Sequence, residues 1–394
     1  MRNPKAHFTK ALAADPDRIH VAAHSHHLWP DVSETAQARA WNDAMRLADR
    51  KWDFIFEELW PKAQSHVARL LRLPDPRSVT FSPSTHDFLV RILSCVSSDE
   101  RPPRVLTTDS EFHSAHRQFE RLEEEGLLDV VRVPQEPFAS FEERWQAEAS
   151  KGPFDLVFLS HVSYRSGFVT NLSAALAPFM GDAPSEGPLV VVDGYHGFCA
   201  VDTDFAPFAK RAFYVAGGYK YAMSGEGCCF LHAPPGYGTR PRITGWFASF
   251  GSLASAATGT VPYGKDASRF LGATFDPTAI YRFVAVMDLL EREQMSISAL
   301  SAHARSLSAT FVAGLEERAL PLRKSQLLLP VESPVRGAFL TFEFEGEDEA
   351  TKVHERLLAA NIVTDVRGER LRLCFSAYHD DADVVRLLER LETV

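Results

Sequence analysis

Short apolar runs alternate with amphipathic segments from Ser78 to about Leu231. The runs read SVTF, RVLTT, DVVRV, DLVFLS, PLVVVD, AFYVAG and CCFLH. Segments such as STHDFLVRILSCV, SAHRQFERLEEEG and NLSAALAPFM, which lie between them, carry apolar residues at helical spacing. Alternation of buried strands and helices is typical of a mostly parallel sheet covered on both faces. The pattern therefore predicts an α/β domain, in which ligands gather beyond the carboxyl ends of the strands.

The pattern differs on either side of this region. The first seventy residues read as an arm followed by helices, and the segment DVSETAQARAWNDAMRLADR offers Asp31 or Ser33 as a helix cap. A loop rich in Gly, Ala and Ser runs from 249 to 268, and long loops of this kind often have a functional or interfacial role. We predict three parts: an N-terminal arm and helices (1–70), a large α/β domain (71–275) and a small α+β domain (276–394).

Composition narrows the class of partner. The chain of 394 residues is 45% hydrophobic and 24% charged, with a formal net charge of −10. This charge disfavours nucleic acid or an anionic membrane as the main partner. No apolar stretch is long enough to span a bilayer, and the start of the chain lacks the apolar region of a secretory signal. The five cysteines have no zinc-type spacing, so we expect a cytoplasmic protein with reduced thiols.

Two residues at predicted strand ends carry the first chemical signal. Asp193 ends the run PLVVVD, and Lys220 follows the next run within YVAGGYKYAMSGEG. Taken singly, the aspartate reads as a helix cap or a structural ion pair, and the lysine as a surface residue. A lysine among aromatic residues also suits a desolvated amine that can form a Schiff base. Together the two residues are what pyridoxal phosphate (PLP) requires, an acid for its ring nitrogen and an amine for its aldehyde carbon.

Two further segments suit the same cofactor. Ser82, Ser84 and Thr85 precede an amphipathic helix, where free backbone N–H groups and hydroxyls can hold a phosphate. Ser84 also reads as a simple N-cap. The segment DSEFHSAH follows a predicted strand and offers Phe112 and His113 as flat groups that can stack on a pyridine ring. For Phe112, a place in the hydrophobic core is the alternative.

With these residues, the chain resembles the class V aminotransferase group of fold-type I PLP-dependent enzymes, and it is most similar to kynureninase. The matching segments are HVSYRSG (161–167), VDGYHG (192–197), GGYKYAMSGEG (217–227), GW (245–246) and LRLCFSAY (371–378). They occur in the order that the family has and cover most of the chain from Ser78 onward. The resemblance implies a large domain with a mostly parallel seven-stranded sheet and a small α+β C-terminal domain.

The resemblance implies roles for the residues around the cofactor ring. Lys220 forms the Schiff base, and Asp193 pairs with the pyridinium nitrogen. His196 faces the phenolic edge of the ring, and Phe112 stacks on its face. These four residues are candidates for catalysis and cofactor binding.

It also implies a phosphate site and a substrate site. The phosphate is held by hydroxyl-bearing residues, namely Ser84, Thr85 and Tyr219. Arg372 binds the α-carboxylate of the substrate, which suits a bidentate guanidinium. Trp246 lies near the phosphate or the substrate, in its own or in the neighbouring subunit.

Members of the family are homodimers with active sites at the subunit interface. The resemblance therefore implies a homodimer with shared active sites, and the loop 249–268 is the candidate for reaching across; an ordinary surface loop is the alternative. The implied substrate is an α-amino acid. In kynureninase-like chemistry its amino group displaces Lys220, water attacks a γ-carbonyl, and the β–γ carbon bond breaks to give alanine and an acid. Tyr219 and His26 are candidates for the additional acid or base.

The segment AHSHHLWP departs from the family. It stands where kynureninases have a substrate-facing asparagine–serine–leucine–glycine stretch, so Ser25 and His26 are candidates for binding the distal group of the substrate. A zinc site built on His24, His26 and His27 is the alternative. Their spacing does not place three imidazoles around one metal on a helix, and we predict no metal.

Three other functions remain open. Transamination uses the same cofactor site but needs room for a second acid. Cysteine desulfuration needs a mobile thiolate near the cofactor. Cys374 lies in a predicted strand beside Arg372, and this disfavours desulfuration. A non-enzymatic PLP-binding protein is disfavoured because Lys220, Asp193 and Arg372 occur together.

Overall fold

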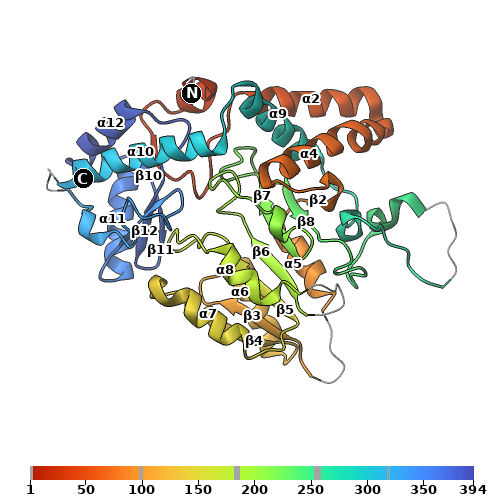
Figure 1. The fold of residues 1–394 in the computed structure, drawn as a ribbon. Coiled ribbons are helices and arrows are strands. Elements are labelled where there is room, and N and C mark those ends of the chain that lie inside the picture. Colours follow the sequence, from red (N-terminus) through yellow and green to blue (C-terminus); the bar gives the residue numbers. More distant parts are fainter. Residues whose placement is uncertain (1–2, 97–100, 182–186, 253–258, 317, 319) are drawn as a thin grey trace.

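The computed structural model describes residues 3–96, 101–181, 187–252, 259–316, 318 and 320–394, without the side chains of residues 250–252. A large domain built on a central sheet lies beside a smaller domain formed mainly by the C-terminal part of the chain (Figure 1). The described strands of the large sheet have the order β2-β8-β7-β6-β5-β3-β4. They are β2 (Val79–Ser82), β3 (Arg104–Thr108), β4 (Asp129–Val133), β5 (Leu156–Ser160), β6 (Leu189–Asp193), β7 (Ala212–Gly217) and β8 (Cys229–His232).

The large sheet is mostly parallel. Strands β4, β3, β5, β6 and β7 run parallel, whereas β8 is antiparallel to both of its neighbours, β7 and β2. The α/β fold class and the mostly parallel seven-stranded sheet predicted from the sequence are thus confirmed. Ser160 is in register with Asp193, and Asp193 is in register with Val215. The carboxyl ends of these strands therefore meet at one edge, where parallel sheets bind ligands.

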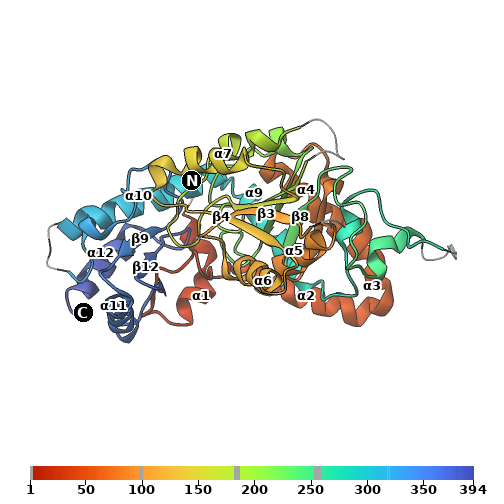
Figure 2. The same ribbon diagram turned by 90° about the horizontal axis from the view of Figure 1, so that it is seen from below.

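Helices cover both faces of this sheet, and Figure 2 shows it between α7 (Phe141–Ala149) on one side and α5 (Thr85–Leu93) and α6 (His113–Glu124) on the other. Successive strand residues point to opposite faces. In β6, Val191 packs with the residues of α5 and α6, whereas Val190 and Val192 pack in a second cluster. That second cluster also contains residues of α4 (Trp60–Leu71), α7, α8 (Leu172–Leu176) and α9 (Thr278–Arg292). The continuous apolar runs of the sequence follow from burial on both faces.

The smaller domain has its own core. Its antiparallel strands have the order β11 (Asp365–Arg367), β12 (Arg370–Leu373) and β9 (Leu340–Glu343). They pack with α10 (Ile297–Glu316), α11 (Glu347–Ala359) and α12 (Asp381–Leu391) around residues such as Leu307, Phe342 and Leu371.

The N-terminal segment joins this smaller core. Strand β1 (Ile19–His20) pairs in parallel with β10 (Ile362–Val363), and Val21 is buried in the same cluster. Conversely, α9 packs against α2 (Val32–Leu47) and α4 rather than within the smaller core. The division into 1–70, 71–275 and 276–394 stays a prediction.

Neither residue expected to cap α2 does so. Asp31 has helical backbone angles (φ −57°, ψ −28°), whereas an N-cap residue needs an extended backbone for its side chain to reach the helix. Its carboxylate instead accepts hydrogen bonds from the backbone N–H groups of Thr9 (3.1 Å) and Lys10 (3.0 Å), at the start of α1 (Thr9–Ala13). The Ser33 hydroxyl has no hydrogen-bond partner among the described residues.

One sequence prediction falls partly on residues outside the described ones, and another concerns membrane spans. Of the loop 249–268, residues 253–258 lie outside the described residues, and its predicted reach into a neighbouring subunit stays a prediction. Across the described helices, none is long and apolar enough to cross a membrane.

Candidate active site

A cavity of about 230 Å³ opens at the carboxyl edge of the large sheet. Seven of the residues singled out from the sequence line it: Ser84, Thr85, Phe112, Asp193, His196, Tyr219 and Lys220. They come from four places along the chain, and the fold brings them together because β2, β3, β6 and β7 end nearby. Four others, Trp246, Arg372, His26 and Ser25, do not line it.

Lys220 lies just beyond β7 and is almost completely buried, with 4% of its surface exposed. Its Nζ is 2.5 Å from Nε2 of His196 and lies 5.1–5.6 Å from the ring centres of Phe112, Tyr195 and Tyr219. Burial lowers the pKa of Lys220 to about 7, and the positive charge of Arg372 contributes to this shift. A buried amine with such a pKa is uncharged in part at neutral pH and can act as a nucleophile.

Two glycines allow the tight approach of the chain before Lys220. A Cβ atom at Gly217 would lie 2.2 Å from the hydroxyl of Tyr195, and one at Gly218 would lie 2.2 Å from Oγ of Ser224. Any side chain at either position would therefore force Tyr195 or Ser224 to shift. The GG of the sequence is thus explained by packing around the lysine loop.

Asp193 ends β6 inside the same cavity. Its Oδ1 accepts a hydrogen bond of 2.9 Å from the backbone N–H of Tyr195. Burial raises the pKa of Asp193 above its usual value, and the charge of Lys220 opposes this shift. Within the described residues, no side chain forms an ion pair with this carboxylate. A buried carboxylate of this kind is suited to a cationic ligand group.

The N-terminus of α5 forms one wall of the cavity. Ser84 caps this helix, since its side chain accepts a hydrogen bond from the backbone N–H of Asp87 at 3.2 Å, as the sequence indicates. The Ser82 hydroxyl donates to the Asp87 carboxylate (2.7 Å). Ser84 and Thr85, at the positive N-terminal end of α5, line the cavity, an arrangement that favours an anion.

Phe112 borders the cavity directly before α6, and its ring centre is 5.4 Å from that of Tyr164. Beside it, Glu111 is a buried residue that the sequence reading missed. Its carboxylate accepts hydrogen bonds from the Ser160 hydroxyl (2.6 Å), the Ser160 N–H (3.1 Å) and the Thr108 hydroxyl (2.6 Å). Burial raises the pKa of Glu111 to about 7, and the negative charge of Asp193 contributes. The sequence signal that could have identified Glu111 is an acidic residue shortly after a predicted strand, which is similar to the signal of Asp193 at the end of its strand.

Arg372 lies on β12 behind the cavity, and its guanidinium is already engaged. Its Nη2 is 2.9 Å from Oδ2 of Asp365, both side chains are buried, and its Nη1 donates to the backbone carbonyl of Tyr164. The two Nη atoms of Arg372, which were expected to bind a substrate carboxylate together, therefore already have partners within the protein. Only Nε has no hydrogen-bond partner among the described residues.

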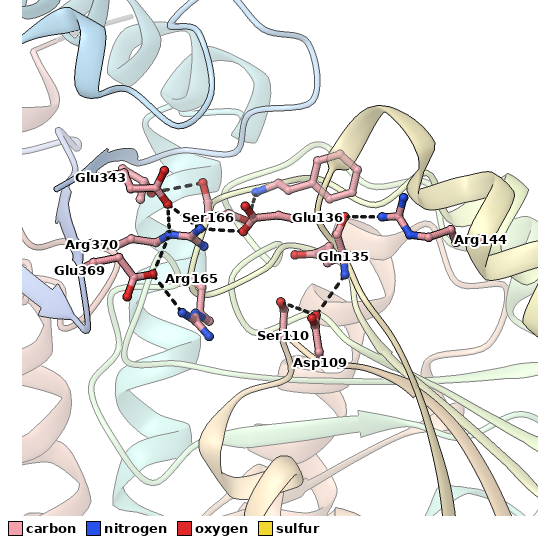
Figure 3. A network of polar contacts seen from close by, with 12 residues as sticks. Asp109, Ser110, Gln135, Glu136, Arg144, Arg165, Ser166, Glu343, Glu369 and Arg370 are labelled. Atoms are coloured by element: carbon pink, nitrogen blue, oxygen red, sulfur yellow. Dashed lines mark hydrogen bonds and ion pairs between the residues drawn. The ribbon is translucent and has the colours of Figure 1, made fainter. Parts of the chain in front are cut away.

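Figure 3 shows a polar network that fastens this strand to the large domain. Arg370 contacts Glu343 and Glu136, each at 2.7 Å, and Glu369 contacts Arg165 at 3.3 Å. Glu136 and Arg165 belong to loops that follow β4 and β5, so the network holds β9 and β12 against the cavity edge.

The histidines of AHSHHLWP have different surroundings. His26 is exposed, stacks on Tyr219 with ring centres 5.0 Å apart, and lies 3.7 Å from the carboxylate of Glu226, which lines the cavity. Ser25 contacts His26 at 3.4 Å. His27 is buried and bonded to the Leu28 carbonyl and the Ser376 hydroxyl.

His24 is fully buried and stacks on Phe339. No group of His, Cys, Asp or Glu side chains suited to a metal ion is found in the part of the chain that the structure describes.

Trp246 and Cys374 do not line the cavity that contains Lys220. Trp246 is 43% exposed and stacks on Phe247, with ring centres 4.1 Å apart. Cys374 is buried, and its thiol contacts the carbonyls of Ala338 and Phe375. Burial raises the pKa of Cys374 to about 12, so this thiol is neither ionised nor mobile.

The solved structures that are similar to this chain share its fold. The family model described as kynureninase C-terminal domain matches residues 300–391. No curated protein sequence matches the chain. The cystine C–S lyase C-DES, solved with its product cysteine persulfide, shares 18% identity at a TM-score of 0.77, over 98% of this chain and 99% of that chain. In another C-DES structure, a mutant holds glycine covalently linked to its PLP cofactor.

Two cysteine desulfurases are equally similar in structure. The enzyme from Thermococcus onnurineus NA1 shares 15% identity at a TM-score of 0.79, over 100% of this chain and 98% of that chain. CsdA from Escherichia coli shares 16% identity at a TM-score of 0.77, with the same coverage. The chain therefore has the fold of PLP-dependent cysteine desulfurases, and the predicted fold-type I architecture is confirmed.

Proposed function

We propose that this chain is a PLP-dependent enzyme that acts on an α-amino acid, with Lys220 as the residue that binds the cofactor's aldehyde carbon. The observation that carries the proposal is one cavity shared by a buried amine, a buried carboxylate and a helix N-terminus. PLP has an aldehyde, a pyridine nitrogen and a phosphate, and each of these features matches one of its groups. The unpaired Asp193 carboxylate fits the ring nitrogen, and the α5 N-terminus fits the phosphate.

When bound, PLP supplies an electron sink for the bonds at the substrate's α-carbon. Asp193 would keep a proton on the ring nitrogen. Lys220 would hold the cofactor, then remove or return a proton at the α-carbon, and its pKa of about 7 suits both tasks near neutral pH. Phe112 would support one ring face, and His196 would lie at the phenolic edge. The phosphate would be held by three residues, Ser84, Thr85 and Tyr219.

Hydrolytic C–C cleavage of the kynureninase type is the reaction we favour. Its support is the match of residues 300–391 to the kynureninase C-terminal domain. Tyr219, which lines the cavity, and the exposed His26, which stacks on it, are candidates for the acid or base that this reaction needs. Transamination by a class V aminotransferase is the alternative. The buried Cys374 speaks against desulfuration, which the structural neighbours named as desulfurases perform.

The cofactor assignment has a direct test. Purified protein incubated with PLP should show a visible absorption band that borohydride bleaches. Lys220→Ala should lose the band, because no other described lysine lines the cavity. Lys210→Ala, which removes an exposed lysine, is the matched control and should keep it. Absence of the band in the unaltered protein would contradict the proposal.

The reaction is tested by its products. Amino acids with a γ-carbonyl, kynurenine among them, should release alanine when given to the PLP-loaded enzyme. Formation of a keto acid, with turnover restored by a second keto acid, would favour transamination instead. We also propose a homodimer with shared active sites and a cytoplasmic location, on the resemblance described above.

A further inference from the structure

Three polar side chains surround the ring of Phe339, close to Lys220. His24 stacks on this ring at 4.8 Å and 26°, the His196 ring centre is 5.6 Å from it, and the Arg372 guanidinium lies 5.6 Å from its centre. These side chains come from the N-terminal segment, the loop after β6 and strand β12. The fold has thus collected them from three distant parts of the chain.

Each of the three has a buried nitrogen without a hydrogen-bond partner in the described structure. The atoms are Nδ1 and Nε2 of His24, Nδ1 of His196 and Nε of Arg372. His24 is the extreme case, since it is 0% exposed and both ring nitrogens are unpaired. Native proteins rarely leave buried polar groups unpaired, and such groups often face a ligand. His27, only three residues further on, has both ring nitrogens bonded.

The charges around this group favour an anion. Arg372 and Arg367 share a single counter-ion, Asp365, at 2.9 Å and 3.0 Å. Two guanidinium groups and one carboxylate leave one net positive charge beside the unpaired nitrogens. Nitrogen donors and one positive charge match a single carboxylate, which offers two acceptor oxygens.

The contacts of Lys220 indicate which carboxylate this group would bind. Its Nζ contacts Nε2 of His196, whose Nδ1 is one of the unpaired atoms. A substrate whose amino group takes the place of Nζ would therefore have these unpaired nitrogens available to its α-carboxylate.

We infer that His24 binds the α-carboxylate of the amino-acid substrate together with Nε of Arg372, an inference that rests on the proposed PLP-dependent function. The sequence predicts that Arg372 binds the carboxylate through two of its own nitrogens. In the structure Asp365 and the Tyr164 carbonyl occupy Nη2 and Nη1, so Arg372 would contribute only Nε and His24 one ring nitrogen. Burial, with the charges of Arg372 and Lys220, holds the pKa of His24 well below its usual value. The imidazole is therefore neutral and donates one N–H.

The test compares a ligand that has a carboxylate with one that lacks it. L-alanine and ethylamine are titrated into the PLP-loaded enzyme, and their dissociation constants are read from the change in its visible band. His24→Leu should raise the dissociation constant of L-alanine about tenfold, which is about 1.4 kcal/mol, and leave that of ethylamine unchanged. His24→Asn, which retains an N–H donor, should restore part of the loss. His354→Leu is the matched control, because this histidine lies on the smaller domain and its Nδ1 is bonded to the Thr364 hydroxyl, whereas both ring nitrogens of His24 are unpaired.

A second readout needs no cofactor. The Tm of cofactor-free His24→Leu should equal or exceed that of the unaltered protein, because the substitution removes two unpaired buried nitrogens. A Tm lower by several degrees would instead indicate a structural role and overturn the inference, as would equal changes for both ligands or none. If His24→Leu does not fold, His24→Asn decides by the same comparison of ligands. A missing visible band in the unaltered protein would refute the proposed function, whereas a band with unchanged L-alanine binding would refute only this inference.

Discussion

At the scale of single residues, the buried acid Glu111 contributes to the dependence of stability on pH. Its pKa is raised from 4.5 to about 7 by burial. Between these pH values the folded protein keeps a proton on Glu111 that the unfolded chain has lost. Stability conferred by the protonated form is therefore complete below pH 4.5 and falls as the pH rises towards 7, by up to about 1.4 kcal/mol per pH unit.

Glu111→Gln should remove this dependence. The amide can retain contacts with Ser160 and Thr108 and does not ionise. We expect the free energy of unfolding of the variant, relative to the unaltered protein, to rise by about 1–3 kcal/mol between pH 5 and pH 7. Urea denaturation at several pH values measures it, with the exposed Glu142→Gln on α7 as control. Parallel pH profiles for the variant and the unaltered protein would contradict this role of Glu111.

The site residues that could be predicted from the sequence are those whose place in the fold follows from their position at the end of a strand. Asp193 ends a strand of the mostly parallel sheet, and Lys220 and Phe112 each come shortly after one, so the three gather at one edge. It could not predict that Asp365 occupies Arg372 or that His24 faces Phe339. Those contacts depend on how the smaller domain packs, and no local pattern encodes the distance between separate elements.

At the scale of elements, the loop that carries Glu226, a residue lining the cavity, packs against the AHSHHLWP segment. Trp29, from AHSHHLWP, lies over Gly225, where a Cβ atom would be 2.3 Å from its ring. Arg282 of α9 stacks on Trp29 at 4.8 Å and donates hydrogen bonds to the carbonyls of Ser224 (2.9 Å) and Glu226 (2.6 Å). The loop that carries Glu226 is therefore fixed by both Trp29 and α9.

Gly225→Ala should destabilise the protein in two separable ways. Its φ of +72° costs an alanine about 1 kcal/mol, and the clash with Trp29 adds about 1–3 kcal/mol. In a Trp29→Ala background only the first cost should remain, which denaturation of all four proteins measures as a double-mutant cycle. Gly126→Ala is the matched control, since its φ is +69° and no atom lies within 4 Å of the added Cβ. Equal losses in both backgrounds would show that Trp29 does not press on this loop.

Element prediction from the sequence succeeded where the pattern was long. All seven strands of the large sheet coincide with the apolar runs, because burial on both faces leaves a continuous signal. The two-residue strand β1 was not predicted, since it exists only through its pairing with β10. The caps expected at Asp31 or Ser33 failed for a similar reason, because Asp31 binds the start of α1 instead.

At the scale of the whole molecule, α2 presents an apolar surface to solvent. Trp41 is 68% and Met45 65% exposed, one helical turn apart. Two large exposed apolar side chains on one helix face are a candidate contact between subunits. They fit the homodimer that we propose.

Replacing both residues by glutamate should weaken this dimer. We expect Trp41→Glu with Met45→Glu to raise its dissociation constant about 30-fold or more, measured by sedimentation equilibrium. Leu358→Glu on α11, which is 53% exposed, is the matched control and should leave the dimer intact. An unchanged dimer in the double variant would place the interface elsewhere, and a monomeric unaltered protein would refute the dimer itself.

The parallel pairing of β1 with β10 also sets the order in which the site can form. Ile19 pairs with Ile362, so about 340 further residues must be synthesised before the segment that leads to His24 finds its partner strand. At roughly 5–20 residues per second, this takes on the order of 20–70 seconds on the ribosome. A nascent chain can thus complete its large sheet before His24 packs beside Phe339, and the proposed carboxylate site forms only when the two ends of the chain meet.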